Sequence, residues 1–436
     1  MRPRGWLVAG AVLAARSAAR GPPPAAPRPV ARSAPPPAAP RPVPRACPMP
    51  EARAVRLGAR AHEDALGRHP QPRNLHLTYA DEPASTLVVQ WVTDDDTLAS
   101  EVRFGLADGP LDLTARGVSF FVLGARKRRY HEVRLCGLEP GRRYLYQAGG
   151  AGLWSARAGF VTAPADARDV RALVLGDSRS SSARRWRQVA ARAISAGVDV
   201  VFFTGDAVSN GASQARWDAF FEAAPELFAN TPLVWADGNH EGRSPLYSAQ
   251  FALPEAPGAG PDGHWYALDY GPLRLVVLND VTVPVEVIQG AETDFLQRTL
   301  AAVNRRRTPF VLTMHHRPLY TTSDEHQPYA PTRQAWLPHF DAHHVDLDLA
   351  GHVHSYESSH PLREEQVTDP SRGTVYFNYG GAGATLYGFR RRAAWLLNRE
   401  SVHGYAVLAA DARRVVWDAF RADGSRIERV ELQRPP

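Results

Sequence analysis

The chain has 436 residues, of which 44% are hydrophobic and 22% are charged, a balance typical of a soluble globular protein with more than one domain. Its net charge of +6 comes from the N-terminus, because residues 1–60 contain eleven arginines and one acid, which leaves 40 basic and 44 acidic residues in the rest. A mildly acidic body argues against nucleic-acid binding, which needs clustered positive charge.

The first 60 residues predict targeting and spacer segments. Arg2 and Arg4 precede an apolar run at 6–15 and small residues at 17–19, which indicates a signal peptide over residues 1–20; a disordered Ala-rich terminus is the alternative. Residues 21–60 are rich in Pro, Ala and Arg and contain one nine-residue sequence twice, at 22–30 and 35–43. We expect an extended linker, and hence an extracytoplasmic protein, secreted or held at the envelope. No other apolar stretch is long enough for a membrane helix, so no integral membrane segment is expected.

Cys47 and Cys136 are the only cysteines. They could pair in an oxidising compartment, but two cysteines alone diagnose nothing, and a small buried apolar role is the favoured interpretation of Cys136. Neither lies among the candidate ligands, which excludes a thiolate zinc site.

Residues 72–163 are rich in strand signals. Leu75–Tyr79 and Thr86–Thr93 favour β-structure, and Trp91 is placed to fill a core. Pro140-Gly141 followed by Tyr144 resembles the tyrosine corner of fibronectin-type sandwiches, in which the tyrosine reaches back to the backbone. The segment therefore predicts a β-sandwich of fibronectin or immunoglobulin type.

Residues 164–436 alternate between strand and helix patterns. Helical apolar spacing occurs at 184–196, 212–223 and 292–307, and strands return at 404–408 and 415–420 before a charged segment at 426–434. We expect two packed sheets with helices outside.

Six short apolar runs in this second part end in a turn and a hard-ligand side chain. The side chains follow runs at 172–175, 200–203, 233–235, 275–278, 310–312 and 345–349; in order they are Gly176-Asp177, Gly205-Asp206, Gly238-Asn239-His240-Glu241, Asn279-Asp280, His315-His316 and Gly351-His352-Val353-His354. Such runs read as buried strands, and sites in α/β proteins form at the carboxyl ends of strands. The set is expected to converge on one rim.

Five of these blocks, with His316 extended to Tyr320, resemble the signature blocks of the calcineurin-like metallophosphoesterases. The sandwich in front makes the chain most similar to the purple acid phosphatase branch, over about residues 72–425. The resemblance implies a multidomain protein in which the N-terminal β-sandwich is followed by an α/β metallophosphoesterase domain of four layers, α/β/β/α.

The resemblance also implies two metal positions. Asp177, Asp206 and His354 would hold the first metal, and Asp206, Asn239, His316 and His352 the second. Carboxylate and imidazole ligands suit Fe, Zn or Mn, and a carboxylate can bridge two ions about 3.5 to 4 Å apart. A structural role would be the better interpretation of any one histidine alone, but the set favours metal binding.

Two positions depart from the family pattern. Arg179 stands where many relatives have a histidine, and Ser209 where the purple branch has an iron-binding tyrosine, so the first metal lacks one protein ligand. Arg179 either contacts a substrate phosphate or is a solvated arginine at a helix start. His315 is ambiguous with His316, but the spacing to Pro318 favours His316 as the ligand.

The implied activity is acid-phosphatase-like hydrolysis of a phosphorylated small molecule by two-metal catalysis, with a metal-bound hydroxide as nucleophile and His240 as general acid. Arg179 and His326 are further candidate catalytic residues; an exposed loop histidine is the alternative for His326. A phosphodiesterase or nucleotide pyrophosphatase is the alternative enzyme. A secreted binding protein that has lost turnover is the alternative from another class.

Overall fold

The computed structural model describes Cys47 and residues 56–434, except 124, 126, 180–182, 256–259, 261–262 and 391. The predicted signal segment at 1–20 and most of the linker at 21–60 lie outside these residues. Leu57–Ala61 form strand β1, which pairs with β6, so a strand begins inside the segment predicted as linker. Within the described part, no helix is long and apolar enough to cross a membrane.

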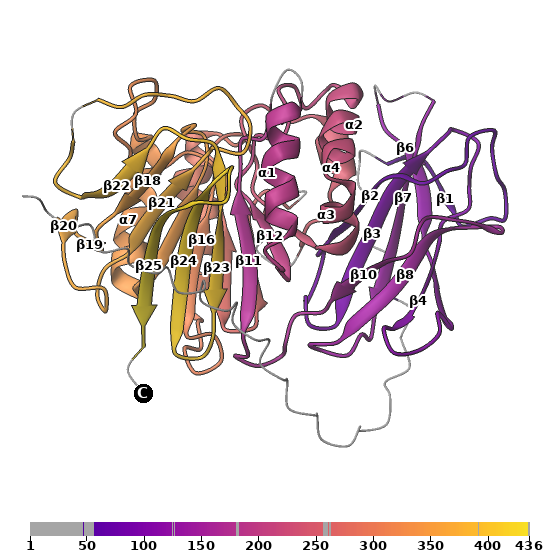
Figure 1. The fold of residues 1–436 in the computed structure, drawn as a ribbon, viewed down its shortest axis with the longest axis horizontal. Coiled ribbons are helices and arrows are strands. Elements are labelled where there is room, and N and C mark those ends of the chain that lie inside the picture. The colour runs from indigo at the N-terminus through magenta and orange to yellow at the C-terminus, as the bar shows by residue number, and fades with distance from the viewer. Residues whose placement is uncertain are drawn as a thin grey trace, which may run out of the picture. The chain divides into compact units, whose positions relative to one another are not determined.

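The N-terminal part is a β-sandwich, as predicted (Figure 1). One sheet contains β1, β2 (Arg73–Thr78), β3 (Thr86–Thr93), β6 (Val118–Phe121) and β7 (Arg129–Cys136). The other contains β4 (Glu101–Leu106), β5 (Leu113–Arg116), β8 (Arg143–Gly150), β9 (Leu153–Trp154) and β10 (Ala158–Val161). Trp91 is buried between them, and the Tyr144 hydroxyl accepts a hydrogen bond from the backbone N–H of Glu139 at 2.9 Å, so this tyrosine does reach back to the backbone.

Cys47 and Cys136 form a disulfide. The favoured interpretation of Cys136 as a small unpaired apolar residue is therefore wrong. The bond ties the segment before β1 to the end of β7, and it joins residues too far apart in the sequence, 89 positions, for spacing to reveal.

The sandwich and the following part share one sheet. Strand β2 pairs in parallel with β13 (Leu233–Trp235) through Thr78 and Leu233, so a single sheet has the order β1-β6-β7-β3-β2-β13-β12-β11-β23-β24-β25. Polar contacts reinforce this junction. The Tyr146 hydroxyl donates to the carbonyl of Ala229 at 2.7 Å, and the Asn74 amide donates to Asp218 at 2.8 Å.

The second part has two sheets with helices on their outer faces (Figure 1). Besides β13, the first sheet contributes β11 (Val170–Leu175), β12 (Val200–Phe203), β23 (Gly404–Ala410), β24 (Arg414–Arg421) and β25 (Arg426–Gln433). The second contains β14 (Tyr266–Tyr270), β15 (Leu273–Val277), β16 (Phe310–Met314), β17 (Leu347–Ala350), β21 (Val375–Tyr379), β18 (Tyr356–Ser359) and β22 (Leu396–Glu400). A hairpin, β19 (Leu362–Arg363) and β20 (Gln366–Val367), stands apart.

Buried aromatic residues hold the four layers together. Between the sheets, Phe377 stacks on Trp417 with ring centroids 4.2 Å apart. Outside the first sheet, Trp186 packs edge-on against Phe203. Outside the second, Trp336 belongs to a separate buried cluster. The layer order α/β/β/α is thus confirmed.

The helices follow the apolar pattern only in part. The first outer layer contains α1 (Arg184–Ile194), α2 (Gln214–Ala223), α3 (Pro225–Asn230) and α4 (Pro245–Gln250). The second contains α5 (Val285–Val287), a π-helical turn η2 (Ile288–Glu292), α6 (Thr293–Ala301) and α7 (Ala330–His343). The helix predicted at 292–307 ends six residues early, and α7, which contains Pro338, was not predicted.

Candidate metal centre

The candidate ligands lie in loops at the carboxyl ends of β11, β12, β13, β16 and β17. Asp177 and Asp206 are fully buried, and both have left-handed backbone conformations, with φ of 57° and 59°; His352 has φ of 65°. Gly238 allows these loops to meet, because a Cβ there would lie 2.4 Å from Asp206 Oδ1. The loops that follow these strands therefore approach one another closely, and their side chains point into the same region.

Asp206, His316 and His352 offer ligand atoms that all lie within 4.8 Å of one another. His316 Nε2 is 3.0 Å from Asn239 Oδ1 and 3.5 Å from Asp206 Oδ2. His316 Nδ1–H donates to the carbonyl of Thr204 at 2.7 Å, which leaves the Nε2 lone pair directed at the cluster. The residues expected at the second metal thus meet in a geometry that suits a cation.

Asp177 and His354 form the other half of the centre. One Asp177 oxygen accepts the backbone N–H of His352 at 2.8 Å. The other is buried, has no hydrogen-bond donor among the described residues and lies 3.3 Å from His354 Nε2. His354 Nδ1–H donates to the carbonyl of Thr385, which again leaves Nε2 free to accept. A buried carboxylate oxygen without a donor is costly, and a metal ion would satisfy it.

Arg179 lies inside the centre and is not a solvated arginine. Its Nε–H donates to Asp206 Oδ2 at 3.1 Å, and Nη2 is 3.1 Å from His354 Nε2. The guanidinium thus contacts two of the three side chains expected at the first metal. Burial opposes ionisation of Asp206, but His316 and then Arg179 outweigh it, so the pKa of Asp206 is held well below its usual range.

Glu241 supports the loop that carries Asp206. Its buried carboxylate accepts the backbone N–H groups of Asp206 at 2.9 Å and Ala207 at 2.7 Å. Burial, with Asp206 nearby, raises the pKa of Glu241 to about 8. Sequence reasoning gave this residue no role, although an acid directly after Asn239-His240 was a usable signal.

His315 faces away from the centre. Its Nε2 lies 3.0 Å from Asp348 and its Nδ1 3.4 Å from Asp280, so His316 reaches the cluster and His315 does not. The Asn279-Asp280 pair, predicted on the same rim, contributes no side chain to the cluster; Asp280 accepts the backbone N–H of Arg317. These residues form the layer behind His316.

The two other catalytic candidates border the cluster. His240 Nδ1 faces the carbonyl of Ser209 at 3.2 Å and its Nε2 lies 3.9 Å from Asp206, with 32% of the side chain exposed. The ring of His326 lies 4.2 Å from that of His352. Tyr387, which no motif indicated, stacks on His354 with ring centroids 4.1 Å apart.

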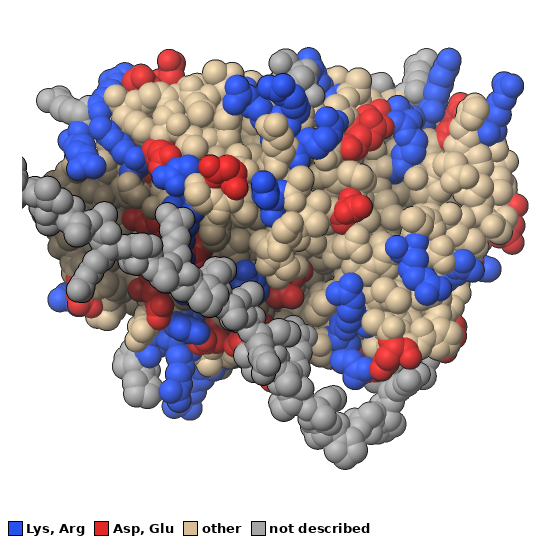
Figure 2. Space-filling view, in the orientation of Figure 1, with Lys and Arg blue, Asp and Glu red and all other residues tan. Residues whose placement is uncertain are grey.

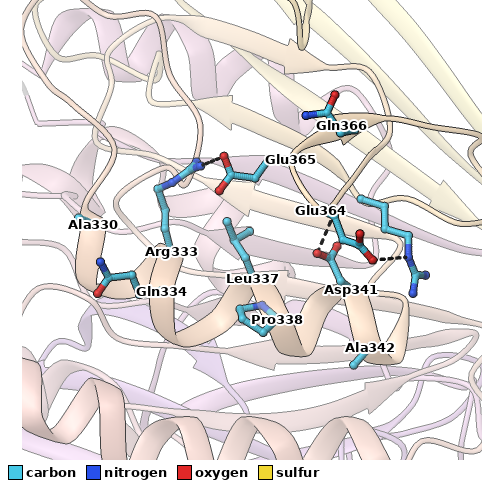
Figure 3. A pocket seen from close by; sticks show the side chains of 11 residues that line it. Ala330, Arg333, Gln334, Leu337, Pro338, Asp341, Ala342, Glu364, Glu365 and Gln366 are labelled. Carbon is cyan, nitrogen blue, oxygen red and sulfur yellow. Dashed lines mark hydrogen bonds and ion pairs between the residues drawn. The ribbon is translucent and has the colours of Figure 1, made fainter.

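A cleft of about 980 Å³ opens from the centre on the His354 side. A second cavity, of about 970 Å³, lies between α7 and the β19–β20 hairpin (Figure 3). None of the candidate ligands lines it, and its charged groups pair with each other, as Arg333 does with Glu365 at 3.0 Å. The candidate functional site is therefore the centre with its adjoining cleft.

Comparison with known proteins agrees with this arrangement. Residues 72–162 match the family model described as "Purple acid Phosphatase, N-terminal domain", and residues 170–356 match "Calcineurin-like phosphoesterase". Acid phosphatase type 7 of Homo sapiens is 31% identical over 338 residues, which cover 71% of this chain and 76% of that protein. The Mus musculus protein of the same name is 29% identical over 409 residues, covering 84% and 92%.

Among solved structures, the purple acid phosphatase PPD1 from yellow lupin (Lupinus luteus) seeds is similar to this chain with a TM-score of 0.73. It is 21% identical, and the match covers 84% of this chain and 75% of that one. This likeness shows the shared fold, a sandwich followed by the α/β domain.

Proposed function

Because the chain belongs to the purple acid phosphatase branch of the calcineurin-like metallophosphoesterases and is a phosphoric ester hydrolase, we propose that it cleaves phosphate monoesters at a binuclear metal centre. The observation that carries this proposal is the meeting of Asp206, His316 and His352 beside the buried, donor-free oxygen of Asp177. Carboxylate and imidazole groups packed this closely are better satisfied by bound metal ions than by hydrogen bonds to one another.

The contacts support two ligand sets. Asp177, Asp206 and His354 would hold the first metal, and Asp206, Asn239, His316 and His352 the second. Two ions of Fe, Zn or Mn bound there would activate a water molecule and neutralise charge on the phosphoryl oxygens. Thr204 and Thr385 contribute backbone carbonyls that fix the orientation of two of the imidazoles.

The remaining residues act on the substrate. His240 is the general acid: the Ser209 carbonyl fixes its Nδ1, and its Nε2 faces the centre with access to solvent, where a leaving oxygen would need a proton. Arg179 and His326 orient the phosphoryl group from the cleft side. For Arg179 this requires the guanidinium to turn from Asp206 towards a phosphate oxygen.

An extracytoplasmic location fits the covalent structure. Cys47 and Cys136 form a disulfide, and disulfides persist in oxidising compartments but are rare in reducing ones. Together with the N-terminal signal pattern, it supports export of the chain.

Metal content and turnover test the proposal. The purified protein should hydrolyse p-nitrophenyl phosphate faster than bis(p-nitrophenyl) phosphate, lose this activity to a chelator and regain it with Zn²⁺ or Fe. A preference for the diester would make the phosphodiesterase alternative correct. Bound metal without turnover of either substrate would point to the binding protein.

A variant separates the centre from a contaminating activity. Asp206→Asn removes charge from both metal positions, so it should reduce bound metal and lower kcat/KM by more than about 100-fold. That is the upper end of the loss expected for a residue that only orients a metal ligand. Near-normal turnover with two metals per chain would rule out the assignment.

A further inference from the structure

The cleft beside the centre is strongly basic. Its lining residues are Arg179, Arg184, Arg185, Ser209, Arg216, His354, Gly383, Thr385, Leu386, Tyr387 and His403. Four are arginines, and none of these described lining residues is acidic. Residues 61–436 carry a net negative charge, so this concentration of arginine is a local property of the cleft.

Two of the four arginines in the cleft have no carboxylate partner among the described residues. Arg185 and Arg216 are exposed and, among the described residues, make no ion pair, while Arg179 turns to Asp206 at the centre. Arg116, by contrast, has Glu101 as a carboxylate partner at 2.7 Å. Two guanidiniums without an ion-pair partner that face one cavity suit an anion from outside the protein.

Helix α1 places two of these arginines where they oppose its own stability. Arg184 and Arg185 occupy its first turn, which contains no acidic residue, and the preceding Ala183 offers no side-chain cap. The N-terminus of a helix carries partial positive charge, so basic residues there are unfavourable and an anion is favourable. Figure 2 shows basic side chains gathered at the upper edge of this face, over the start of α1.

The basic cleft is continuous with the catalytic centre. His354, one of its lining residues, contacts Asp177, and Tyr387 stacks on His354. Arg216, from α2, lines the same cavity as Ser209, whose carbonyl holds His240. An anion held by the arginines and a phosphoryl group at the centre can therefore belong to one molecule.

We infer that the substrate carries a second phosphate group, which Arg184, Arg185 and Arg216 bind while the first phosphoryl group is cleaved at the centre. This inference rests on the proposed function and names its substrate class: organic phosphates with at least two phosphoryl groups. A cleft of about 980 Å³ has room for both groups and the organic part between them. Arg184, Arg185 and Arg216 are thus specificity residues.

A matched pair of substrates tests this inference without changing the leaving group. Butane-1,4-diol bisphosphate and butyl phosphate both release a primary alcohol, but only the first offers a second phosphate. The wild-type protein should have the higher kcat/KM on the bisphosphate, and added NaCl should reduce this preference because exposed charge interactions are screened.

Three variants assign the preference to the cleft. In the double variant Arg184→Ala/Arg185→Ala, and to a smaller extent in Arg216→Ala, the ratio of kcat/KM for the bisphosphate over the monophosphate should fall, by about three- to fivefold per arginine removed. Arg192→Ala is the matched control, since Arg192 is an exposed arginine in the last turn of the same helix and does not line the cleft. Its ratio should equal that of the wild type.

The outcomes are distinguishable from a failure of the proposed function. Equal kcat/KM on both substrates, or a ratio unchanged by the arginine variants, would overturn the inference while leaving the phosphatase assignment intact. If neither compound is hydrolysed, the proposed function fails. Calorimetry then measures the binding of the same two compounds and tests the inference about the cleft separately. Tighter binding of the bisphosphate that is lost in Arg184→Ala/Arg185→Ala supports it, and equal binding overturns it. The Tm of the double variant, measured beside that of the wild type, shows whether the variant is folded.

Discussion

His240 is the residue whose role depends most on the chemistry of the leaving group. If it protonates the departing oxygen, its loss must matter more for an alkyl alcohol than for nitrophenolate, which leaves without a proton. We expect His240→Ala to lower kcat on butyl phosphate by about 10² to 10⁴ and on p-nitrophenyl phosphate clearly less. Metal content should be retained, since Asn239 is the proposed ligand in this loop.

Equal losses on the two substrates, with metal still bound, would instead assign His240 to binding of the phosphoryl group. Loss of metal would make it a ligand or the support of one. Steady-state kinetics on both substrates and metal analysis of the same preparation decide among these roles.

Arg179 makes the two metal positions unequal. Its guanidinium contacts Asp206 and His354 at 3.1 Å, so a cation at the first proposed position must displace it from two ligands, whereas a cation at the second must displace it from Asp206 alone. Titration of the metal-free protein with Zn²⁺ should therefore show one tight and one weaker site. Arg179→Met should tighten the weaker site by about tenfold or more, the size of a one-unit effect of a neighbouring charge.

The matched control is Arg187→Met, because Arg187 is an exposed arginine of α1 that, among the described residues, forms no hydrogen bond or ion pair with a candidate ligand. Two sites of equal affinity in the wild-type protein, or no change in Arg179→Met, would show that the guanidinium leaves the centre without cost.

Strands β3 and β7 contain a buried histidine, His131, that makes the stability of the fold depend on pH. His131 faces Trp91 across the two strands, stacks on it at 4.9 Å and contacts the hydroxyls of Thr93 and Ser100. Burial, with Arg129 nearby, lowers the pKa of His131 from 6.5 to about 3. The unfolded chain therefore takes up a proton first as the pH falls, and stability is lost progressively from about pH 6.5 towards 3.

This single histidine should cost about 2 kcal/mol of unfolding free energy between pH 7 and pH 5. His131→Gln keeps a polar group near both hydroxyls but does not titrate, so denaturant unfolding should show a pH 7 to pH 5 difference smaller by about that amount. An identical difference in the wild type and the variant would mean that His131 is protonated in the folded state.

Most strands that carry the centre were predictable because their signals are local. The runs at Val200–Phe203 and Leu233–Trp235 match β12 and β13 residue for residue, since each is short, apolar and ends at a turn. The side chains of Asp206, His316 and His352 lie close together, because parallel strands of both sheets end at the same rim.

What could not be predicted depends on contacts between distant segments. The position of Arg179 requires knowing that β12 and the loop after β17 approach it from two sides, and Tyr387 has no partner in sequence until the chain has folded. Helix α7 contains a proline that argues against it locally, and packing of Trp336 against the second sheet overrides that preference.

At the scale of the whole molecule, the sheet shared through β2 and β13 couples the sandwich to the catalytic part. The Tyr146–Ala229 and Asn74–Asp218 bonds lie at this junction, and Asn230 accepts the backbone N–H of Gly159 at 2.9 Å. Calorimetry should therefore show one unfolding transition. Asn230→Ala should lower its midpoint by the equivalent of about 1 kcal/mol without splitting it. Two resolved transitions in the wild type would show that the sandwich unfolds on its own.

The left-handed conformations of Asp177, Asp206 and His352 serve the activity of the protein but lower the stability of its fold. Such a conformation in a non-glycine residue costs on the order of 1 to 3 kcal/mol, and the centre has three, with two buried carboxylates besides. Glycine at either aspartate would relieve backbone strain and remove a buried negative charge, so selection for heat resistance in the absence of metal would favour the substitutions that destroy the enzyme. Bound metal reverses this preference, and an organism that limits metal supply would expose the chain to the same conflict.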